Sequence, residues 1–309
     1  MVLQIVGLGE RIIGTIGAST AFFLFVGMGS AWSAPITFNT ALPVAEDEFI
    51  FRQQVVYDRS GDDPSGADRD REVFAAVSVL GYGVTSDLAV FGIMPYVDKS
   101  LEITSMGVRR TRDTRGIGDL ALFGRYTIVQ NDIPGRTFRI APFVGVELPT
   151  GEDDETDGLG RLPASVQAGS GSTDPFGGLV ATYQTLDFEM DAQASYKIST
   201  EANNFEFGDV ARLDASLQYR LWPRSLQSGV PGFLYGVFEE NLIHQNKNRS
   251  NGAKDPDSGG TTLFLVPGLQ YVTQRWIVEG GVQIPVVQDL NGMALEKDFI
   301  VRCGFRFNF

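Results

Sequence analysis

The side chains that could serve as a catalytic base or nucleophile in this chain are few. The 309-residue sequence has a single histidine, His244, and two serines, Ser250 and Ser258, follow it at a short distance. A hydrolase needs a nucleophile or an activated water, usually with a histidine base. No nucleophile elbow, zinc motif or phosphate-binding loop surrounds these residues. The sequence therefore predicts no enzyme, with a loop-sited hydrolase built on His244 as the minor alternative.

Metal chemistry has little support in the sequence. The one cysteine, Cys303, excludes an intramolecular disulfide or a cysteine-based metal site. The acidic run at 152–157 (EDDETD) could hold Ca²⁺ or contact divalent-bridged lipopolysaccharide, but it lacks EF-hand ligand spacing. A solvated, self-repelling loop is the simpler interpretation. We expect no metal and no cofactor, and the formal net charge of −13 argues against nucleic-acid binding.

Charged residues elsewhere alternate with apolar ones. In 187–198 the even positions are apolar or small, whereas nearly every odd position is charged or amide-bearing. The segment 208–221 also alternates, with apolar side chains at the odd positions from 213 and polar ones at the even positions from 212. In the last eleven residues, Phe299 to Phe309, six apolar side chains on one face oppose Arg302 and Arg306 on the other. A period of two is the period of a β-strand. An apolar face backed by arginines indicates a closed barrel with lipid outside and water inside.

The polar side chains should therefore point into the lumen, because an arginine or lysine facing lipid at the bilayer midplane costs about 2–4 kcal/mol. The candidate lumen-lining residues are Asp119, Arg125, Arg139, Glu147, Glu189, Asp191, Lys197, Arg212, Asp214, Arg220, Glu279, Arg302 and Arg306. Their alternative role is purely structural, as opposite charges that pair across neighbouring strands. The mixed signs argue against strong selectivity for anions or cations.

We expect an all-β protein, a twelve-stranded antiparallel transmembrane β-barrel of the outer-membrane type over residues 49–309. After the first 34 residues no apolar run is long enough for a membrane helix. The expected strands lie near 49–57, 72–83, 88–97, 117–128, 137–148, 175–184, 187–198, 208–221, 233–244, 261–272, 276–286 and 297–309. Long polar connections (58–71, 98–116, 149–174, 199–207, 245–260 and 287–296) alternate with shorter turns, of which 129–136 and 222–232 are the longest. This alternation is typical of barrels with both termini in the periplasm.

The two ends of the chain indicate export and assembly. Residues 1–33 are expected to form a signal peptide, cleaved near Ser33 because Ala31 and Ser33 satisfy the small-x-small rule; an uncleaved membrane anchor is the alternative. Residues 34–48 would then be a periplasmic segment that could plug or gate the inner mouth. At the other end, Phe305, Phe307 and Phe309 resemble the terminal strand of bacterial outer-membrane barrels. In those barrels a final phenylalanine serves the assembly machinery.

Three short motifs carry a more specific resemblance. They are 116–120 (GIGDL), 147–151 (ELPTG) and 169–174 (GSGSTD). Their order and spacing, followed by further amphipathic strands, resemble the phenol meta-degradation-pathway family of outer-membrane β-barrel transporters. By strand order the resemblance covers roughly residues 45–309, although the motifs are confined to about 116–175. It implies passage of small, often aromatic or hydrophobic compounds across the outer membrane.

The function expected from the sequence is a passive outer-membrane channel or uptake protein for small organic compounds. Its expected partners are outer-membrane lipid and lipopolysaccharide, the barrel-assembly machinery and a small-molecule substrate. The alternative from another class is a structural or interaction barrel with a blocked lumen, whose loops contact lipopolysaccharide or a partner. The sequence does not distinguish an open lumen from a plugged one.

Overall fold

A computed structural model describes residues 33–225 and 230–309. Except for Ser33, the expected signal peptide lies outside these residues. Across the two described ranges, no helix is long and apolar enough to span a membrane.

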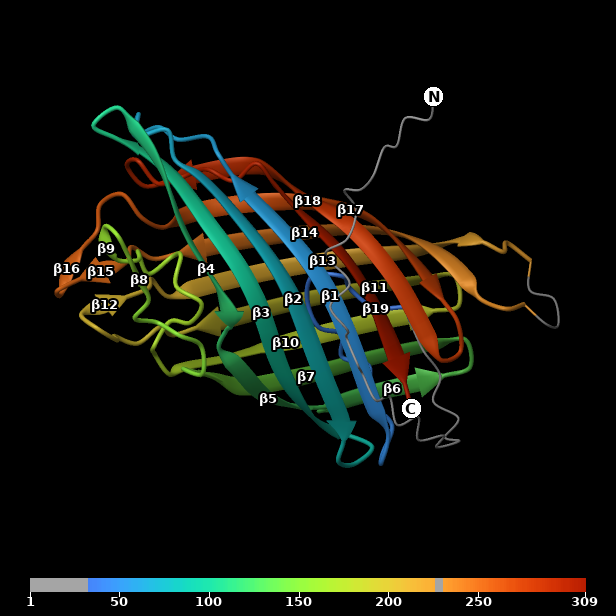
Figure 1. Cartoon of the computed structure of the whole chain (residues 1–309). Coiled ribbons are helices and arrows are strands. Elements are labelled where there is room, and N and C mark those ends of the chain that lie inside the picture. Colours follow the sequence, from blue (N-terminus) through green and yellow to red (C-terminus); the bar gives the residue numbers. More distant parts are fainter. Residues whose placement is uncertain (1–32, 226–229) are drawn as a thin grey trace, which may run out of the picture.

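The described chain forms a closed antiparallel barrel of twelve strands (Figure 1). The barrel strands are β1 (Phe49–Ser60), β2 (Asp70–Gly83), β3 (Leu88–Ser105), β5 (Leu120–Tyr126), β7 (Arg136–Leu148), β10 (Asp174–Thr185), β11 (Phe188–Lys197), β13 (Val210–Trp222), β14 (Phe233–Gln245), β17 (Gly260–Val272), β18 (Trp276–Leu290) and β19 (Phe299–Asn308). The last strand closes the ring by pairing with the first, from Ile50↔Asn308 to Arg59↔Phe299. The predicted fold class and strand number are confirmed.

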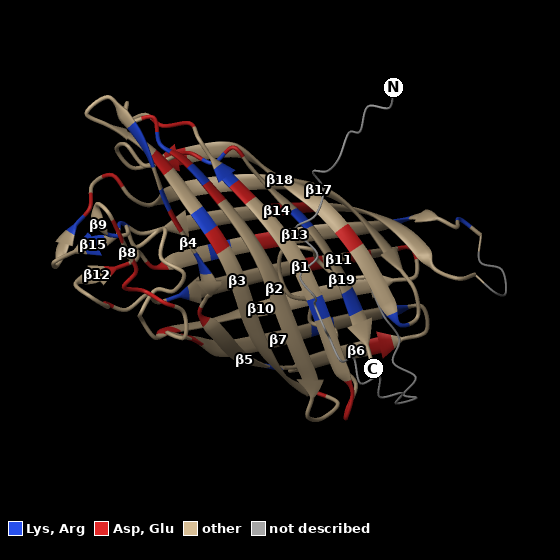
Figure 2. Ribbon diagram, viewed as in Figure 1, with Lys and Arg blue, Asp and Glu red and all other residues tan. Residues whose placement is uncertain are grey.

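The strands turn apolar side chains outward and polar side chains inward. On β7, Val144 is 71% exposed, and on β13 Leu213 is 58% exposed, whereas Glu189 on β11 is completely buried. Figure 2 shows that Lys, Arg, Asp and Glu gather at the end that carries β4, β8, β9 and β12. An apolar outer band of this kind is the surface that a membrane requires.

The short turns share one local device. Thr85, Thr185 and Thr273 each begin a tight turn, and each hydroxyl accepts a hydrogen bond from the backbone N–H three residues later, at 3.0–3.1 Å. Threonine can make this bond because its hydroxyl takes the place of a backbone acceptor in a turn. The sequence thus fixes three of the hairpins at the end opposite the long loops.

The prediction of a loop at 98–116 is wrong. β3 continues to Ser105 and returns as β4 (Val108–Ile117), so this polar stretch is a hairpin that projects beyond the barrel (Figure 1). Met106 and Gly107, with φ of 52° and 76°, form its turn. The hairpin is supported because its Leu101 is buried against Leu162 and Val166 of the next long loop.

Other connections also contain regular structure. The expected turn at 129–136 is a hairpin, because β6 (Val129–Ile133) pairs with the start of β7 around Gly135, whose φ is 89°. The long loops contain β8 (Thr156–Asp157) with β9 (Gly160–Arg161), and β12 (Phe205–Glu206) with β15 (Arg249–Ser250) and β16 (Ala253–Lys254). Part of the connection at 222–232 lies outside the described residues. The long-loop end is therefore more ordered than its polar composition indicates.

Candidate functional site

Residues 33–44 run inside the barrel, and we call them the N-terminal plug. Although they precede the first strand, Ile36, Ala41 and Val44 are at most 2% exposed. Their neighbours lie on strands from all around the ring, between 16 and 236 positions away in sequence. The lumen is therefore crossed by a peptide segment of the same chain.

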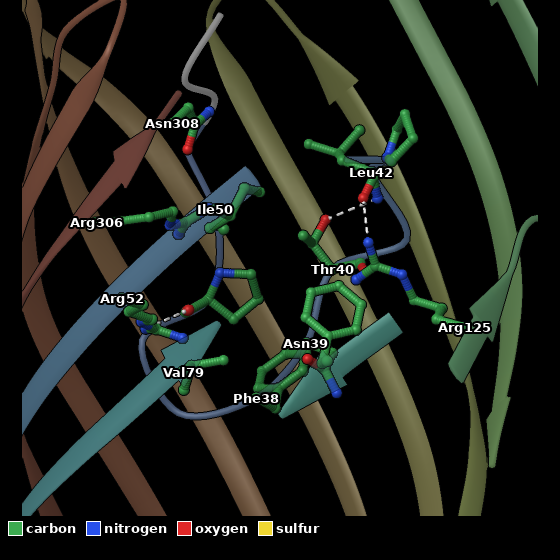
Figure 3. A pocket seen from close by; sticks show the side chains of 14 residues that line it. Phe38, Asn39, Thr40, Leu42, Ile50, Arg52, Val79, Arg125, Arg306 and Asn308 are labelled. Carbon is green, nitrogen blue, oxygen red and sulfur yellow. Dashed lines mark hydrogen bonds between the residues drawn. The ribbon is translucent and has the colours of Figure 1, made fainter. Parts of the chain in front are cut away.

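The plug is extended, and inward-pointing polar side chains bind its backbone. Glu239 on β14 accepts hydrogen bonds from the N–H groups of Ile36 at 2.6 Å and Thr37 at 3.1 Å. Arg52 on β1 donates to the carbonyl of Ile36 at 2.8 Å, and Arg125 on β5 donates to that of Leu42 at 2.5 Å. Figure 3 shows both arginines reaching the segment from opposite sides. The strands thus supply the partners that the plug backbone would otherwise find in water.

A second set of inward side chains forms ion pairs along the wall. Arg52 pairs with Glu279 at 2.5 Å, and Arg212 pairs with Asp214 at 2.9 Å. Lys197 lies 3.6 Å from Glu147 and 3.8 Å from a further carboxylate, that of Asp174. These pairs place opposite charges side by side on the wall, which compensates part of the charge that the lumen carries.

Two adjacent cavities lie between the long-loop end and the plug. The outer cavity, of about 540 Å³, has a polar lining that includes Lys99 and Asp119. The inner cavity, of about 510 Å³, ends on Ile36–Asn39 of the plug. The two share Glu147, Lys197 and Val210 in their walls. A small molecule that enters between the loops therefore meets the Lys197–Glu147 pair before it reaches the plug.

The lining of the inner cavity combines apolar and polar side chains. Phe123, Phe143 and Phe176 line it, and Phe91 stacks on Phe123 with ring centroids 4.6 Å apart. Arg52, Gln193, Lys197 and Arg212 also line it, and Lys197 is the cross-strand partner of Phe176. On the far side of the plug lies a smaller cavity of about 90 Å³, which Figure 3 shows between Phe38, Arg125 and Arg306. The arrangement offers apolar and hydrogen-bonding groups to the same ligand.

One carboxylate joins all three sequence motifs at the long-loop end. Asp119, between β4 and β5, accepts hydrogen bonds from the backbone N–H of Gly151 at 3.0 Å and of Ser170 at 2.7 Å. The Ser170 hydroxyl donates to the same carboxylate at 2.7 Å. Gly151 and Gly169 lie so close that a Cβ on either would clash with the backbone of the other. The motifs therefore form a single structural unit, which we call the rim lock.

The sequence-predicted site residues fall into four groups by location. Arg125 and Glu189 contact the plug. Those that line the inner and outer cavities are Asp119, Glu147, Lys197 and Arg212. Those buried in the inner wall or bonded within it are Asp191, Asp214, Glu279, Arg302 and Arg306. Arg139, which pairs with Asp132 of β6, and Arg220, which pairs with Asp187, lie at the short-turn end.

Sequence reasoning missed Arg52, Glu239, Gln270 and Thr182, all of which contact the plug or the ion pairs. Glu239 is followed by a second glutamate, so the face of β14 that points inward could not be assigned from the pattern. Thr182 and Gln270 are neutral and gave no charge signal. The alternation of β1, in which Arg52 and Gln54 both point inward, could have identified Arg52.

The residues of the hydrolase alternative are not brought together. The His244 ring nitrogen Nδ1 lies 2.9 Å from the hydroxyl of Thr261, on the exposed face of β14. Ser258 is engaged with the backbone of Asn248 and Asp255. Within 33–225 and 230–309, no group of three or more His, Cys, Asp or Glu side chains has the arrangement of a metal site.

Comparison with known proteins shows which structures the fold resembles and which family the sequence matches. Its fold is similar to that of an outer-membrane channel from Pseudomonas putida F1, with a TM-score of 0.67 at 12% identity over 93% of this chain and 100% of that one. The β domain of the Bordetella autotransporter BrkA has a TM-score of 0.49 at 12% identity over 85% of this chain and 100% of that one. The CymD monoaromatic hydrocarbon channel has a TM-score of 0.38 at 10% identity over 86% of this chain and 89% of that one.

None of the curated proteins matches the sequence. The family model described as "Putative MetA-pathway of phenol degradation" matches residues 56–285. Because this match covers more than half of the chain, the protein belongs to that family, as its three rim motifs predicted.

Proposed function

We propose that this protein is a passive outer-membrane channel for small organic molecules, closed at rest by the N-terminal plug. The observation that carries the proposal is the pair of adjacent cavities that share wall residues, of which the inner one ends on the plug. Membership of a family described by phenol degradation supports passage of aromatic compounds. The long-loop end would face outward and the short-turn end the periplasm.

The lining of the inner cavity favours a molecule with an apolar body and one polar group. Phe123, Phe143 and Phe176 would pack against an aromatic ring, because offset and edge-to-face ring pairs are favourable. Arg212 and Gln193 would bind a hydroxyl or carboxyl group. A phenol or a small aromatic acid matches this pattern, and movement would follow the concentration gradient.

Opening requires the plug to move. Its contacts with the wall are mostly hydrogen bonds that water can replace, at a net cost of about 0.5–1.5 kcal/mol for a neutral partner and about 1.5–3 kcal/mol for a charged one such as Glu239. Apolar contacts such as that of Ile36 with the closely packed Gly268 and Gly281 would hold the resting position more firmly. A segment bound in this way can leave without unfolding the barrel.

The proposal is tested by the conductance of the refolded mature chain in planar bilayers. Deleting residues 34–44 should raise single-channel conductance several-fold, because these residues fill the lumen. A second variant pairs Thr40→Cys with Thr182→Cys, whose hydroxyls are 3.0 Å apart, in a Cys303→Ser background. Oxidation should lock the channel shut and reduction should restore the parent conductance, while each single cysteine variant serves as the control.

Two results would contradict the proposal in different ways. If the deletion variant conducts no ions, the lumen is blocked elsewhere and the barrel is structural, which is the alternative function. If deletion leaves an existing conductance unchanged, the channel assignment survives and the gating role of the plug is lost. We also propose that the protein has no catalytic role, so His244→Ala should leave transport unchanged.

We propose two envelope partners. Phe309 stacks on Phe49 at 5.7 Å, and their backbones exchange hydrogen bonds at the seam of the barrel. Recognition of this final residue by the assembly machinery would couple insertion to closure of the ring. The acidic run at 152–157 would face lipopolysaccharide, and Ca²⁺-dependent binding of lipopolysaccharide to the wild type but not to a variant with neutral residues there would support that contact.

A further inference from the structure

Glu189 on β11 is a buried carboxylate that forms no ion pair within residues 33–225 and 230–309, although the charge of Arg306 lies near it. It is completely inaccessible, and its Oε2 accepts hydrogen bonds from the hydroxyl of Ser33 at 2.7 Å and from the amide of Gln184. Among the described residues, its Oε1 has no hydrogen-bond partner. Asp191, two positions away on the same inner face, is also buried, and its carboxyl group interacts directly with that of Glu189. A buried carboxylate in this position is costly unless a cation approaches it.

Arg306 of β19 is the cation that faces this region, but its contact is incomplete. It is 9% exposed, and no ion pair links it to Glu189 in the part of the chain that the structure describes. Its own Nε and Nη2 also lack partners. The carboxylate of Glu189 is therefore aimed at the start of the plug rather than at a wall arginine.

The predicted cleavage site lies at the same place. The backbone nitrogen of Ala34 is 3.2 Å from Oε1 of Gln270, and the carbonyl of Ala34 accepts from Nε2 of Gln270 at 2.9 Å. Ser33, whose hydroxyl meets Glu189, and Ala34 are each 3% exposed. Removal of the leader adds water across the Ser33–Ala34 peptide bond. The carboxylate leaves with Ser33, and the amine of Ala34 takes up a proton.

We infer that the α-ammonium group of the mature chain, on Ala34, binds in a pocket formed by Glu189 and Gln270. The inference rests on the proposed export and on the plug of the proposed function. An ammonium group has three donors and a full charge. It can therefore donate a hydrogen bond to Oε1 of Gln270 and also occupy the place that the Ser33 hydroxyl holds beside Glu189. The anchor exists only after cleavage, because an internal peptide nitrogen has one donor and no charge. Leader removal would thus set the resting position of the plug.

The first test is the mass of the mature protein purified from outer membranes. We expect a chain that begins at Ala34. A chain that begins at any other residue overturns the inference, whatever its conductance, because the charge would not lie beside Glu189.

The second test measures how firmly the plug is seated, independently of transport. Asn39→Cys in a Cys303→Ser background places one thiol on the plug, where it lines the inner cavity. Its reaction rate with a water-soluble maleimide is compared between the parent, Ala34→Ser, which keeps the amine, and Ala34→Gln, whose terminus cyclises to a neutral pyroglutamate. We expect labelling about tenfold faster without the amine and nearly unchanged with serine, corresponding to about 1.4 kcal/mol.

A double-variant cycle ties the effect to Glu189. Glu189→Gln alone should also accelerate labelling about tenfold, and combining it with Ala34→Gln should add little, because both changes remove the same interaction. Equal labelling rates in all chains, or additive effects of the two changes, would overturn the inference. Since the pyroglutamate chain keeps Glu189, a folding defect of Glu189→Gln cannot produce the expected pattern, and conductance of the parent tests the proposed function separately.

Discussion

Asp119 illustrates how one carboxylate can organise a barrel mouth. Its three hydrogen bonds connect backbone groups that lie 32 and 51 positions away, and they join the three family motifs into the rim lock. The two glycines of the lock allow the backbones to approach more closely than any side chain would permit. The motifs are therefore best explained as structure around the outer cavity, to whose lining Asp119 also contributes.

Asp119→Ala should loosen the rim lock. Hydrogen bonds to a charged acceptor contribute about 1.5–3 kcal/mol each, and a partly exposed site retains only part of that. We expect a local loss of about 2 kcal/mol, which corresponds to amide exchange at Gly151 and Ser170 that is roughly 30-fold faster by mass spectrometry. Asp154→Ala, an exposed carboxylate in the same loop, is the matched control. Unchanged exchange in the Asp119 variant would show that the glycine packing alone holds the lock.

The hairpin of β3 and β4 projects beyond the part of the barrel that faces lipid. It extends past the barrel, and Arg112 on β4 forms a two-pronged ion pair with Asp157 of β8, at 2.7 and 2.9 Å. Arg112 also donates to the carbonyls of Gly160 and Arg161. The hairpin thus holds the adjacent long loop over the outer cavity.

This contact should depend on pH. The hydrogen bond from Arg112 lowers the pKa of Asp157 below its usual value. The contact therefore adds stability above the ordinary carboxyl pKa of roughly 4, and this stability is lost as the pH falls through the lowered pKa. The carboxyl carbon shift of Asp157, followed by NMR, should titrate at a lower pH in the wild type than in Arg112→Gln. Arg110→Gln, at an exposed position of the same strand, should leave the titration unchanged, and an equal midpoint in all three proteins would contradict the assignment.

Across the whole molecule, the distribution of polar and apolar side chains is the reverse of that in a water-soluble protein. Large apolar side chains such as Val144, Leu213 and Leu269 are more than half exposed, whereas Glu189, Glu239 and Gln270 are completely buried. An apolar surface of this extent would cause aggregation in water, but lipid covers it in a membrane. Burial of the inner polar groups is tolerated because the plug and the wall form hydrogen bonds with one another.

Val144→Arg should therefore destabilise the folded barrel. Val144 lies well inside β7 and faces outward, so an arginine there would cost about 2–4 kcal/mol near the bilayer midplane. The measurement is the free energy of unfolding in denaturant for protein refolded into vesicles. Val144→Leu, which stays apolar, should change it by less than about 0.5 kcal/mol. A cost as small for arginine as for leucine would mean that this strand does not face hydrocarbon.

Much of the architecture could be predicted from the sequence because its causes are local. Alternation along 187–198 and 208–221 sets which face of each strand meets lipid, and the threonine turns set where hairpins reverse. Each strand then pairs with its neighbours in sequence, apart from the contact of the first strand with the last. The hairpin at 98–117 was missed because polar strands outside a membrane carry no apolar face to reveal them.

A closed ring of strands, apolar outside and polar inside, with three short motifs near one mouth, follows from the order of the residues alone. Three features required the folded structure: residues 33–44 fill the lumen, Asp119 joins the motifs, and Glu239 and Gln270 bind the plug. The plug has no periodic pattern, and its contacts join residues up to 236 positions apart. Such contacts exist only once the ring has closed, because closure brings strands from both halves of the chain around one extended segment.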